Sequence, residues 1–302
     1  MHRKRSCGFA SVNEAVLPRR IPKRRNVSVV SAAGHPIIGV PRNSHIVFVM
    51  PVYPPKTELH PAPLTRLYRR LHRIAFLPVL YVQGLFVRWN TVKLHEPAGP
   101  REGVIGDGPD LRVLILGDSS AAGVGTQDQS QALSGQMAAI LKHHVRLDWQ
   151  LVARSGDTTP MALDHVKEAA PRPVDLVVVG LGVNDILHGT HQAAWLRQTQ
   201  DLIDHLTGPY GATHVYLSGI PPVIQFPRLP QPLRWVLGHR AAQFDRALRV
   251  YVKDMPHVSM IAADMPMEGD VMSEDGFHPG PIVFTAWANS VTRRVKADLG
   301  LS

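Results

Sequence analysis

The second half of the chain alternates between short apolar runs and longer segments in which apolar residues recur every three or four positions. Short runs bounded by turn residues are typical of buried strands, and the longer spacing is typical of amphipathic helices. Because strands and helices alternate, we expect an α/β fold, with a five-stranded, mostly parallel sheet covered on both faces. The predicted strands are 111–117, 148–154, 174–181, 213–220 and 258–263. The predicted helices lie near 129–144, 160–169, 192–207, 235–254 and 281–297.

The clearest pattern is LRVLILGDSSAAGVG at 111–125, which is typical of a central buried strand that ends in a tight turn. The turn carries Asp118, Ser119 and Ser120. In open α/β sheets, ligands bind at the carboxyl ends of the strands. A serine hydroxyl at this place suits nucleophilic catalysis when a base, and a group that orients the base, lie nearby.

Residues 1–60 have little periodicity and contain clusters such as RKR, PRRIPKRR and PVYPPK. This composition predicts a basic, Pro-rich and disordered segment. Met50 is an alternative start, so whether residues 1–49 belong to the mature protein stays open. The chain has one cysteine, Cys7, which excludes an intramolecular disulfide and is compatible with the cytoplasm.

Residues 61–110 are predicted to form a basic and apolar N-terminal segment followed by a Pro- and Gly-rich connector. The stretch 64–73, LTRLYRRLHR, has a helical pattern, and the apolar stretch 74–87 follows it. The apolar stretch is too short to span a bilayer, and no small-residue cleavage site of a signal peptide follows it. Two interpretations stay open: a helix packed on the next domain, or contact of residues 64–88 with an anionic membrane surface.

The net charge of +9 is spread unevenly along the chain. Residues 1–49 carry nine Lys or Arg against one acidic residue, whereas residues 111–302 carry 16 against 18. The basic character therefore belongs to the front of the chain and not to the predicted sheet. No basic motif with interleaved aromatic residues is present, so we expect no nucleic-acid partner.

Polar clusters follow the first three predicted strands, and a fourth cluster precedes the last helix. Because the carboxyl ends of parallel strands share one edge of a sheet, these clusters are expected to converge. They meet the needs of acyl transfer, with Ser119 as nucleophile, His278 as base and Asp275 to orient the imidazole. The four clusters are 117–120 (GDSS), 154–159 (RSGDTT), 182–185 (GVND) and 275–279 (DGFHP).

A tetrahedral intermediate also needs hydrogen-bond donors for its oxyanion. The backbone N–H groups of Ser119 and Gly156 and the side-chain amide of Asn184 are the candidate donors. Glycine allows a close approach of the backbone, and Asn is a neutral donor where Asp would repel the oxyanion.

With these clusters the chain resembles the GDSL/SGNH hydrolases, which are Ser-His-Asp esterases and lipases on a flavodoxin-like α/β/α fold. The resemblance covers about 111–297 of a predicted hydrolase domain at 111–302, and it rests on GDS with Ser119, on Gly156, on GVND with Asn184, and on DGFH with Asp275 and His278. It implies a catalytic set of Ser119, Asp275 and His278 and an oxyanion hole of Ser119, Gly156 and Asn184. It implies neither a metal nor an organic cofactor.

The chain departs from the family pattern at two places. Ser120 stands where a leucine often follows GDS, and no asparagine lies just ahead of Gly156. These departures leave the catalytic set in place but obscure the subfamily and the substrate.

Simpler interpretations compete for several of these residues. Ser119 alone is compatible with a helix cap, and Ser120 is a neighbouring hydroxyl that we assign to the turn. Asp185 and His188 form a second DxxH, but the later pair precedes the final helix, where the family has its dyad. His188 and His191 have the spacing of metal ligands on a helix, but no cysteine or convincing carboxylate accompanies them, so no metal site is expected. The Gly-rich turn lacks the Lys-Ser/Thr of a phosphate-binding loop.

The segment 220–238, IPPVIQFPRLPQPLRWVLG, follows the fourth strand and is rich in proline and apolar residues. It is expected to form a stiff apolar loop at the active-site edge. Either it packs on the sheet or it lines an acyl pocket through Phe226, Leu229 and Trp235. In the second case a hydrophobic acyl group is favoured over a sugar-borne acetate.

These observations predict a serine hydrolase that cleaves small-molecule or lipid carboxylic esters or thioesters through an acyl-enzyme on Ser119. A non-catalytic membrane-surface or carbohydrate-binding protein on the same fold is the alternative from another class. Acyl transfer to an acceptor other than water also stays open, because the same acyl-enzyme serves both reactions. A cytoplasmic, membrane-associated location is compatible with the absence of a clear signal peptide or transmembrane stretch.

Overall fold

The structure is a computed structural model and describes residues 63–169, 172–263, 265, 267 and 269–301. The disordered segment predicted for residues 1–60 lies outside the described residues, as do Met50 and Cys7. The described residues belong to one compact unit.

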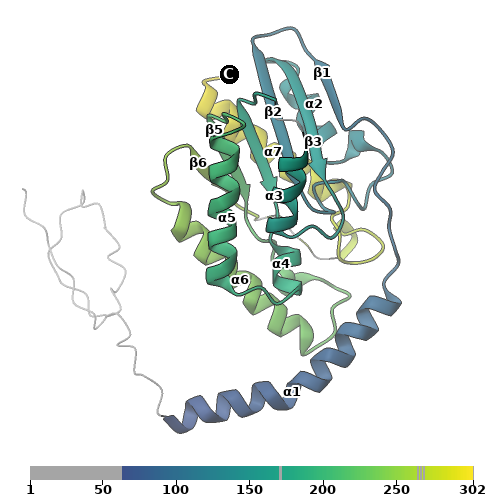
Figure 1. Ribbon diagram of the computed structural model, residues 1–302. Helices are drawn as coiled ribbons and strands as arrows, with labels where there is room; N and C mark the ends of the chain where they lie inside the picture. The colour runs from purple at the N-terminus through teal and green to yellow at the C-terminus, as the bar shows by residue number, and fades with distance from the viewer. Residues whose placement is uncertain (1–62, 170–171, 264, 266, 268, 302) are drawn as a thin grey trace, which may run out of the picture. The chain divides into compact units, whose positions relative to one another are not determined.

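A six-stranded sheet forms the centre of this unit (Figure 1). The spatial order is β1-β3-β2-β4-β5-β6, and among the described strands only β1 is antiparallel to its neighbour. The five parallel strands have the order of a flavodoxin-like sheet, which confirms the predicted fold class. The strands are β1 (Glu102–Ile105), β2 (Asp110–Gly117), β3 (Arg146–Ala153), β4 (Leu176–Gly180), β5 (His214–Ser218) and β6 (Val258–Ile261).

The sixth strand, β1, was not predicted and lies in the stretch expected to be a connector. Its sequence EGVI is short and mostly exposed, so it has neither the length nor the apolar pattern of a core strand. It pairs with the outer edge of β3, with Glu102 opposite Gln150 and Ile105 opposite Leu147. The strand therefore depends on a partner that is distant in sequence, and this explains why the local pattern does not show it.

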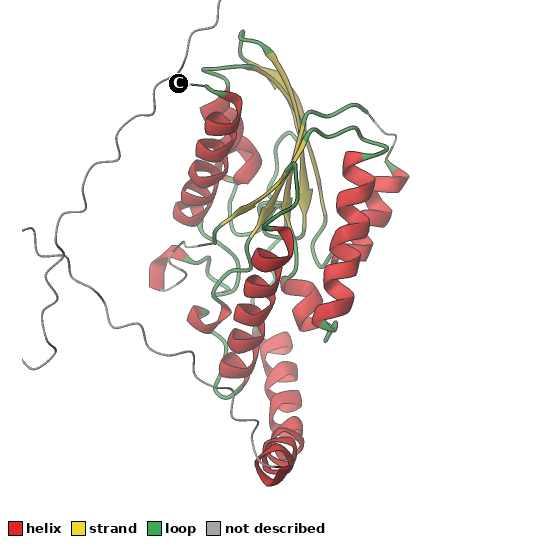
Figure 2. Ribbon diagram, turned by 90° about the vertical axis from the view of Figure 1, so that its left-hand side faces the viewer, coloured by secondary structure: helices red, strands yellow, loops and turns green. Residues whose placement is uncertain are grey.

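Helices lie on both sides of the sheet, giving the three-layer arrangement seen in Figure 2. On one side α2 packs against α7, and on the other α5 packs against α3 and α6. Their apolar stripes bury Trp195 and Phe284 against the apolar strands. The helices are α2 (Leu133–Leu141), α3 (Thr159–Glu168), α4 (Val183–Leu187), α5 (Gln192–Thr207), α6 (Leu233–Val252) and α7 (Pro281–Leu299).

Two helix boundaries differ from the predicted ones. The helix expected from residue 129 is split into a 3₁₀ turn at Gln129–Gln131 and α2, because Ala132 between them is extended. The Asp128 side chain caps the 3₁₀ turn by accepting from the Ser130 N–H. The helix α6 begins at Leu233, inside the segment expected to be a loop.

The carboxyl end of β2 is the point at which the sheet changes its direction of winding. The chain leaves β2 through α2 to reach β3 on one side and then returns through α3 to β4 on the other. Ligands in open α/β sheets bind at such a switch point. This topology places the turn after β2 between the ends of β3 and β4.

The basic and apolar stretches predicted near 64–87 form one continuous helix, α1 (Pro63–Asn90). It contacts the first part of α6, and Val87 packs against the core of the unit. No helix in the described part of the chain combines the length and the apolar character needed to cross a membrane.

Candidate active site

The turn after β2 brings the hydroxyl of Ser119 to the ring of His278, which lies in the loop before α7. Ser119 Oγ lies 2.8 Å from His278 Nε2, and His278 Nδ1 lies 2.5 Å from Asp275 Oδ2. The three residues predicted from the sequence thus form one chain of hydrogen bonds. Ser120 has a different role, because its backbone N–H donates to Asp118 Oδ1 and orders the turn.

The turn that carries Ser119 is packed closely on β4. A Cβ at Gly117 would lie 2.4 Å from the Cβ of Ala121 and 2.5 Å from the carbonyl oxygen of Gly180, so only glycine fits. The Asp118 N–H donates to the same Gly180 oxygen over 3.2 Å. The position of the nucleophile is therefore tied to the central strands.

Asp275 is almost completely buried and is held by donors from its own turn. Its Oδ1 accepts from the backbone N–H groups of Phe277 and His278 and from the hydroxyl of Ser273, over 2.8 to 3.0 Å. Gly276 adopts a φ of 68°, which lets the turn fold back. One carboxylate oxygen is thus occupied by the turn, and the other is left for the imidazole.

Hydrogen bonding decides the charge of Asp275. Burial by itself would raise its pKa, but the hydrogen bonds from the His278 ring and from the backbone N–H groups of His278 and Phe277 outweigh burial and lower the pKa to about 2. Asp275 is therefore a carboxylate at neutral pH and favours the proton on His278 Nδ1. His278 Nε2 is then free to accept a proton from Ser119.

The three predicted oxyanion donors come from three different strand ends. Among the described residues, neither the Ser119 N–H nor the Gly156 N–H has a hydrogen-bond acceptor. Gly156 has a φ of 92°, and the space where its Cβ would lie is open. Both N–H groups thus remain available to a ligand.

The amide of Asn184 is oriented by its neighbours. Its Nδ2 donates to the backbone oxygen of Asp157 over 3.0 Å and faces Asp118 Oδ2 at 3.4 Å. The second contact is long for a hydrogen bond, so a better acceptor can replace it. Asn184 lies in the first turn of α4, which begins after Gly182 at a φ of 120°.

Replacing Asn184 by alanine is expected to lower kcat for ester hydrolysis by about 10²–10³, because one oxyanion donor is lost. KM is expected to change little, because the interaction strengthens only in the transition state. Steady-state kinetics on a chromogenic ester measures both constants. The control is Asn289→Ala, which changes an exposed asparagine on α7. An unchanged kcat in Asn184→Ala would remove this residue from the oxyanion hole.

Glu96 is a residue of this site that sequence reasoning missed. Its Oε1 accepts from the backbone N–H and the hydroxyl of Ser155, over 2.9 and 2.8 Å, and its Oε2 pairs with Arg101 at 2.8 Å. Ser155 immediately precedes Gly156. The connector between α1 and β1 therefore holds the loop that carries Gly156, a predicted oxyanion donor. Nothing in the local Pro- and Gly-rich pattern signals this role.

We expect Glu96→Ala to lower kcat by about tenfold, since the loss of hydrogen bonds to a charged group releases the Ser155 loop. Glu96→Gln keeps the acceptor for Ser155 and is expected to restore most of kcat. The matched control is Glu102→Ala, which removes an exposed carboxylate from β1. Kinetics on the three variants tests this positioning role. The role would be contradicted if all three variants had the kcat of the parent protein.

Asp118 is buried beside the nucleophile. Burial raises its pKa to about 6, against the opposing effects of the Ser120 N–H and of His278. A raised pKa means that the folded protein holds this proton more tightly than the unfolded chain does. The free energy of unfolding should therefore fall as pH rises from about 4 to 6, by on the order of 3 kcal/mol from this group.

The variant Asp118→Asn tests this effect, because the amide oxygen can still accept from the Ser120 N–H. Urea unfolding of the parent and the variant at pH 4 and at pH 7 gives the difference in the free energy of unfolding. We expect the free energy of unfolding of the variant, relative to that of the parent, to be about 2–3 kcal/mol higher at pH 7 than at pH 4. A difference independent of pH would show that burying this charge has no cost.

The second DxxH motif does not form a dyad. Asp185 accepts from the N–H and the hydroxyl of Thr159, and His188 Nδ1 lies 2.8 Å from the backbone oxygen of Asn184. Asp185 thus ties α4 to the start of α3. Within the described residues, no group of His, Cys, Asp and Glu side chains is arranged to hold a metal ion.

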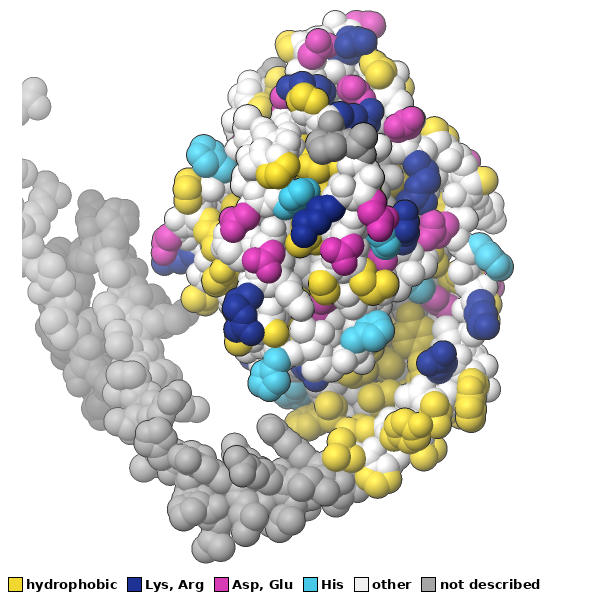
Figure 3. All heavy atoms as spheres, in the orientation of Figure 1, with side chains coloured by type: hydrophobic (Ala, Val, Ile, Leu, Met, Phe, Trp, Pro, Cys, Tyr) yellow, Lys and Arg dark blue, Asp and Glu magenta, His cyan; other side chains and the backbone are white. Residues whose placement is uncertain are grey.

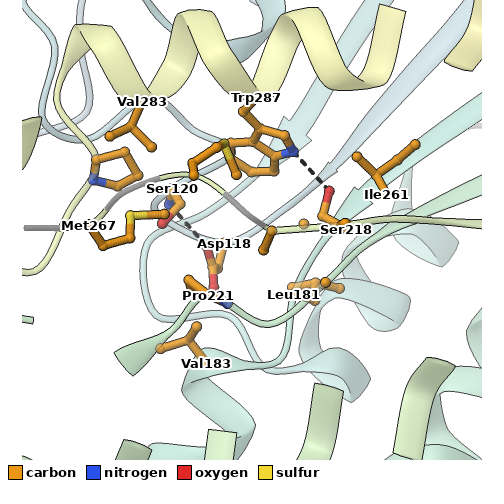
Figure 4. Close-up of a pocket in the computed structure, with 16 residues that line it drawn as sticks. Asp118, Ser120, Leu181, Val183, Ser218, Pro221, Ile261, Met267, Val283 and Trp287 are labelled. Atoms are coloured by element: carbon orange, nitrogen blue, oxygen red, sulfur yellow. Dashed lines mark hydrogen bonds between the residues drawn. The ribbon is translucent and has the colours of Figure 1, made fainter. Parts of the chain in front are cut away.

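An apolar pocket opens beside the nucleophile turn and extends between the ends of β4, β5 and β6 and the helix α7 (Figure 4). Asp118 and Ser120, the two neighbours of Ser119, form part of its wall. Ser218 is another polar residue of the wall, and its hydroxyl accepts from Trp287 Nε1 over 3.0 Å. Apolar lining comes from Leu181, Val183, Pro221, Ile261, Met265, Met267, Val283 and Trp287.

The three residues predicted to line an acyl pocket lie elsewhere in the structure. Phe226 and Leu229 are buried, and the Phe226 ring meets the edge of Phe277 at a centroid distance of 6.5 Å. Trp235 is exposed on α6 and packs against the ring of His239. None of the three lines the pocket beside Ser119. Their contact with substrate stays a prediction, and the pocket itself was not apparent from the sequence.

Comparisons with known proteins identify the family and support the fold. The model of the GDSL-like lipase/acylhydrolase family matches residues 115–282. The fold is similar to a carbohydrate esterase family 2 enzyme from Corynascus thermopiles (Myceliophthora fergusii), with 18% identity, a TM-score of 0.51 and coverage of 68% of this chain and 69% of that one. It is also similar to a Clostridium thermocellum family 3 carbohydrate esterase, with 16% identity, a TM-score of 0.50 and coverage of 63% and 98%.

The search of curated proteins found no match. The family match spans more than half of the chain and includes Ser119, Gly156, Asn184, Asp275 and His278. The name of this family describes lipases and acylhydrolases, and the two similar structures support the same fold. The chain therefore belongs to the GDSL-like lipase/acylhydrolase family.

Proposed function

We propose that the protein is a serine hydrolase that cleaves carboxylic esters or thioesters through an acyl-enzyme on Ser119. The hydrogen-bond chain from Ser119 through His278 to Asp275 carries the proposal. A serine hydroxyl is a weak nucleophile unless a base is within hydrogen-bond reach, and here the base is in turn oriented by a carboxylate.

In the first step, His278 Nε2 takes the proton of Ser119 Oγ as the oxygen attacks the substrate carbonyl carbon. The carbonyl oxygen becomes an oxyanion that accepts from the N–H groups of Ser119 and Gly156 and from Asn184 Nδ2. The intermediate collapses with cleavage of the ester bond, and His278 gives its proton to the departing alcohol or thiol.

In the second step, His278 takes a proton from a water molecule, whose oxygen attacks the acyl-enzyme carbonyl. Collapse of this second intermediate breaks the bond to Ser119 Oγ, and the proton on His278 returns to that oxygen. The products are the free acid and the regenerated enzyme. Asp275 stays ionised throughout and stabilises the imidazolium formed in each half-reaction.

The apolar pocket beside Ser119 supports a hydrophobic acyl group. Both neighbours of the nucleophile form part of its wall, and Met265, Met267 and Trp287 supply apolar surface. Methionine side chains adapt to different apolar shapes, so such a pocket accommodates chains of more than one length. The sugar substrates named for the two similar esterases are not assigned to this chain, because those likenesses support the fold alone.

A fluorophosphonate probe tests the proposal, because it phosphonylates only an activated serine. We expect labelling at Ser119, located by peptide mapping, and no labelling in His278→Ala. The chromogenic ester should at the same time yield the free acid. A folded protein that takes up no probe and releases no acid would overturn the hydrolase proposal.

A further inference from the structure

The helix α1 presents a broad apolar surface to solvent. Figure 3 shows hydrophobic side chains along the part of the helix that precedes the connector. Most large apolar side chains of soluble proteins are buried, and a contiguous exposed group of them marks an interaction surface. The most exposed of these side chains are Leu77, Tyr81, Val82, Phe86 and Trp89, with exposed fractions between 57% and 75%.

The attachment of α1 to the rest of the unit leaves this surface free. Gln83 Nε2 donates to the backbone oxygen of Gln231 over 2.5 Å, and Gln83 Oε1 accepts from the Leu233 N–H over 3.0 Å. Val87, one helical turn beyond Gln83, packs against the core. The face with Gln83 and Val87 is therefore turned toward α6, and Tyr81 and Phe86 lie on other faces of the helix.

The charge of the helix shows which partner suits the apolar surface. The sequence of α1 contains five arginines and no acidic residue, and no acidic residue occurs between Glu58 and Glu96. Arginines together with exposed Trp, Tyr and Phe are typical of helices that lie in the interface of an anionic membrane. A helix of this kind, which is not apolar enough to span a bilayer, lies along its surface.

The place of attachment relates this helix to the active site. The chain passes from the carboxyl end of β5 through Pro221 to the start of α6, so the start of α6 lies toward the edge of the sheet that carries Ser119. Trp235 follows in the first turn of α6 and is also exposed. Trp235 thus adds an exposed apolar side chain two residues beyond Leu233, where α1 is attached through Gln83.

We propose that α1 docks the protein on an anionic phospholipid surface, with its exposed apolar side chains among the lipid head groups and its net positive charge attracted to the lipid phosphates. Docking in this position turns the active-site edge toward the membrane. Binding is measured without turnover, so this proposal does not rest on the proposed function and its failure is distinguishable from a failure of that function.

Co-sedimentation of the full chain with vesicles tests the proposal. One set of vesicles contains phosphatidylcholine alone, and the other contains equal parts of phosphatidylcholine and phosphatidylglycerol. We expect binding to the anionic vesicles at low salt, and weaker binding at high salt or to neutral vesicles, because salt screens the arginines. Arg88→Gln is expected to weaken binding by about fivefold, as one cation near the surface is lost.

The decisive variant carries Tyr81→Ser, Phe86→Ser and Trp89→Ser together, and its binding is expected to fall by about tenfold or more. Val250→Ser is the matched control, because Val250 on α6 is as exposed as Trp89, at 75% for each. Circular dichroism and cooperative thermal unfolding check that the triple variant is folded.

Three outcomes would overturn the proposal. The first is no binding of the parent protein to anionic vesicles at low salt. The second is unchanged binding of the triple variant, which would assign membrane binding to another part of this basic chain. The third is a parent protein that does not bind vesicles but is a dimer in sedimentation, together with a triple variant that is a monomer. This result would assign the surface to a second copy of the chain.

Discussion

Replacing Ser119 by alanine is expected to lower kcat/KM for a chromogenic ester by about 10⁴–10⁶. The variant keeps the packed turn, the oxyanion donors and the Asp275–His278 pair, and it loses only the oxygen that forms the acyl bond. His278→Ala should have an effect of similar size, because an uncharged serine without its base is a poor nucleophile. The double variant should be no worse than either single one, since the two groups act as a unit.

Ser120→Ala is the matched control for this prediction. Ser120 keeps its backbone hydrogen bond to Asp118 when the hydroxyl is removed, and its side chain makes no contact with His278 among the hydrogen bonds of the described residues. We expect this variant to retain most of the activity and to be labelled at Ser119. Full activity in Ser119→Ala, in a preparation free of other esterases, would contradict the mechanism.

Asp275→Asn is expected to lower kcat by about 10⁴, although the change is nearly isosteric. The backbone N–H groups of Phe277 and His278 hold an acceptor at the Oδ1 position, so the amide nitrogen of the new asparagine must face His278. That nitrogen is a donor, so His278 Nδ1 must accept from it. The asparagine therefore favours the tautomer of His278 that carries the proton on Nε2. In this tautomer His278 cannot take the proton of Ser119.

Thermal unfolding separates this effect from a loss of structure. Asp270→Asn, a substitution of an exposed acid on the neighbouring 3₁₀ turn Gly269–Val271, serves as the control and should behave as the parent protein. Thermal unfolding of Asp275→Asn should stay cooperative while kcat is low throughout the neutral range. A kcat within tenfold of the parent would show that Asp275 does not set the tautomer.

Much of the fold was predictable from local pattern alone. The buried strand at Asp110–Gly117 and the fully buried β4 are runs of apolar, often β-branched residues, and such runs are unstable outside a core. Because strands and helices alternate, the order of a parallel sheet follows from few topological rules. The polar clusters were then expected to meet, because parallel strands end at one edge.

Other parts of the site could not be predicted in this way. Glu96 reaches Ser155 across 59 positions of the chain, and β1 forms only because β3 offers a free edge. The pocket wall combines residues from three strand ends and α7, and none of these segments has a pattern of its own that marks a cavity. For α1 the sequence left two interpretations open, and the structure shows contact with α6 through Gln83 together with a large exposed apolar surface.

The sequence by itself determined which residues were available for acyl transfer and in which order they occur, because hydrophobic periodicity and short polar motifs are local properties. The resemblance already favoured Ser119 over Ser120 as the nucleophile, but tertiary structure alone decided how close Ser119 lies to His278, that Asp118 is buried beside them, and that Glu96 holds the loop of Ser155 and Gly156. These are distances between groups far apart in the chain. Such distances are set by how the elements pack, and packing depends on the whole core and not on any one segment.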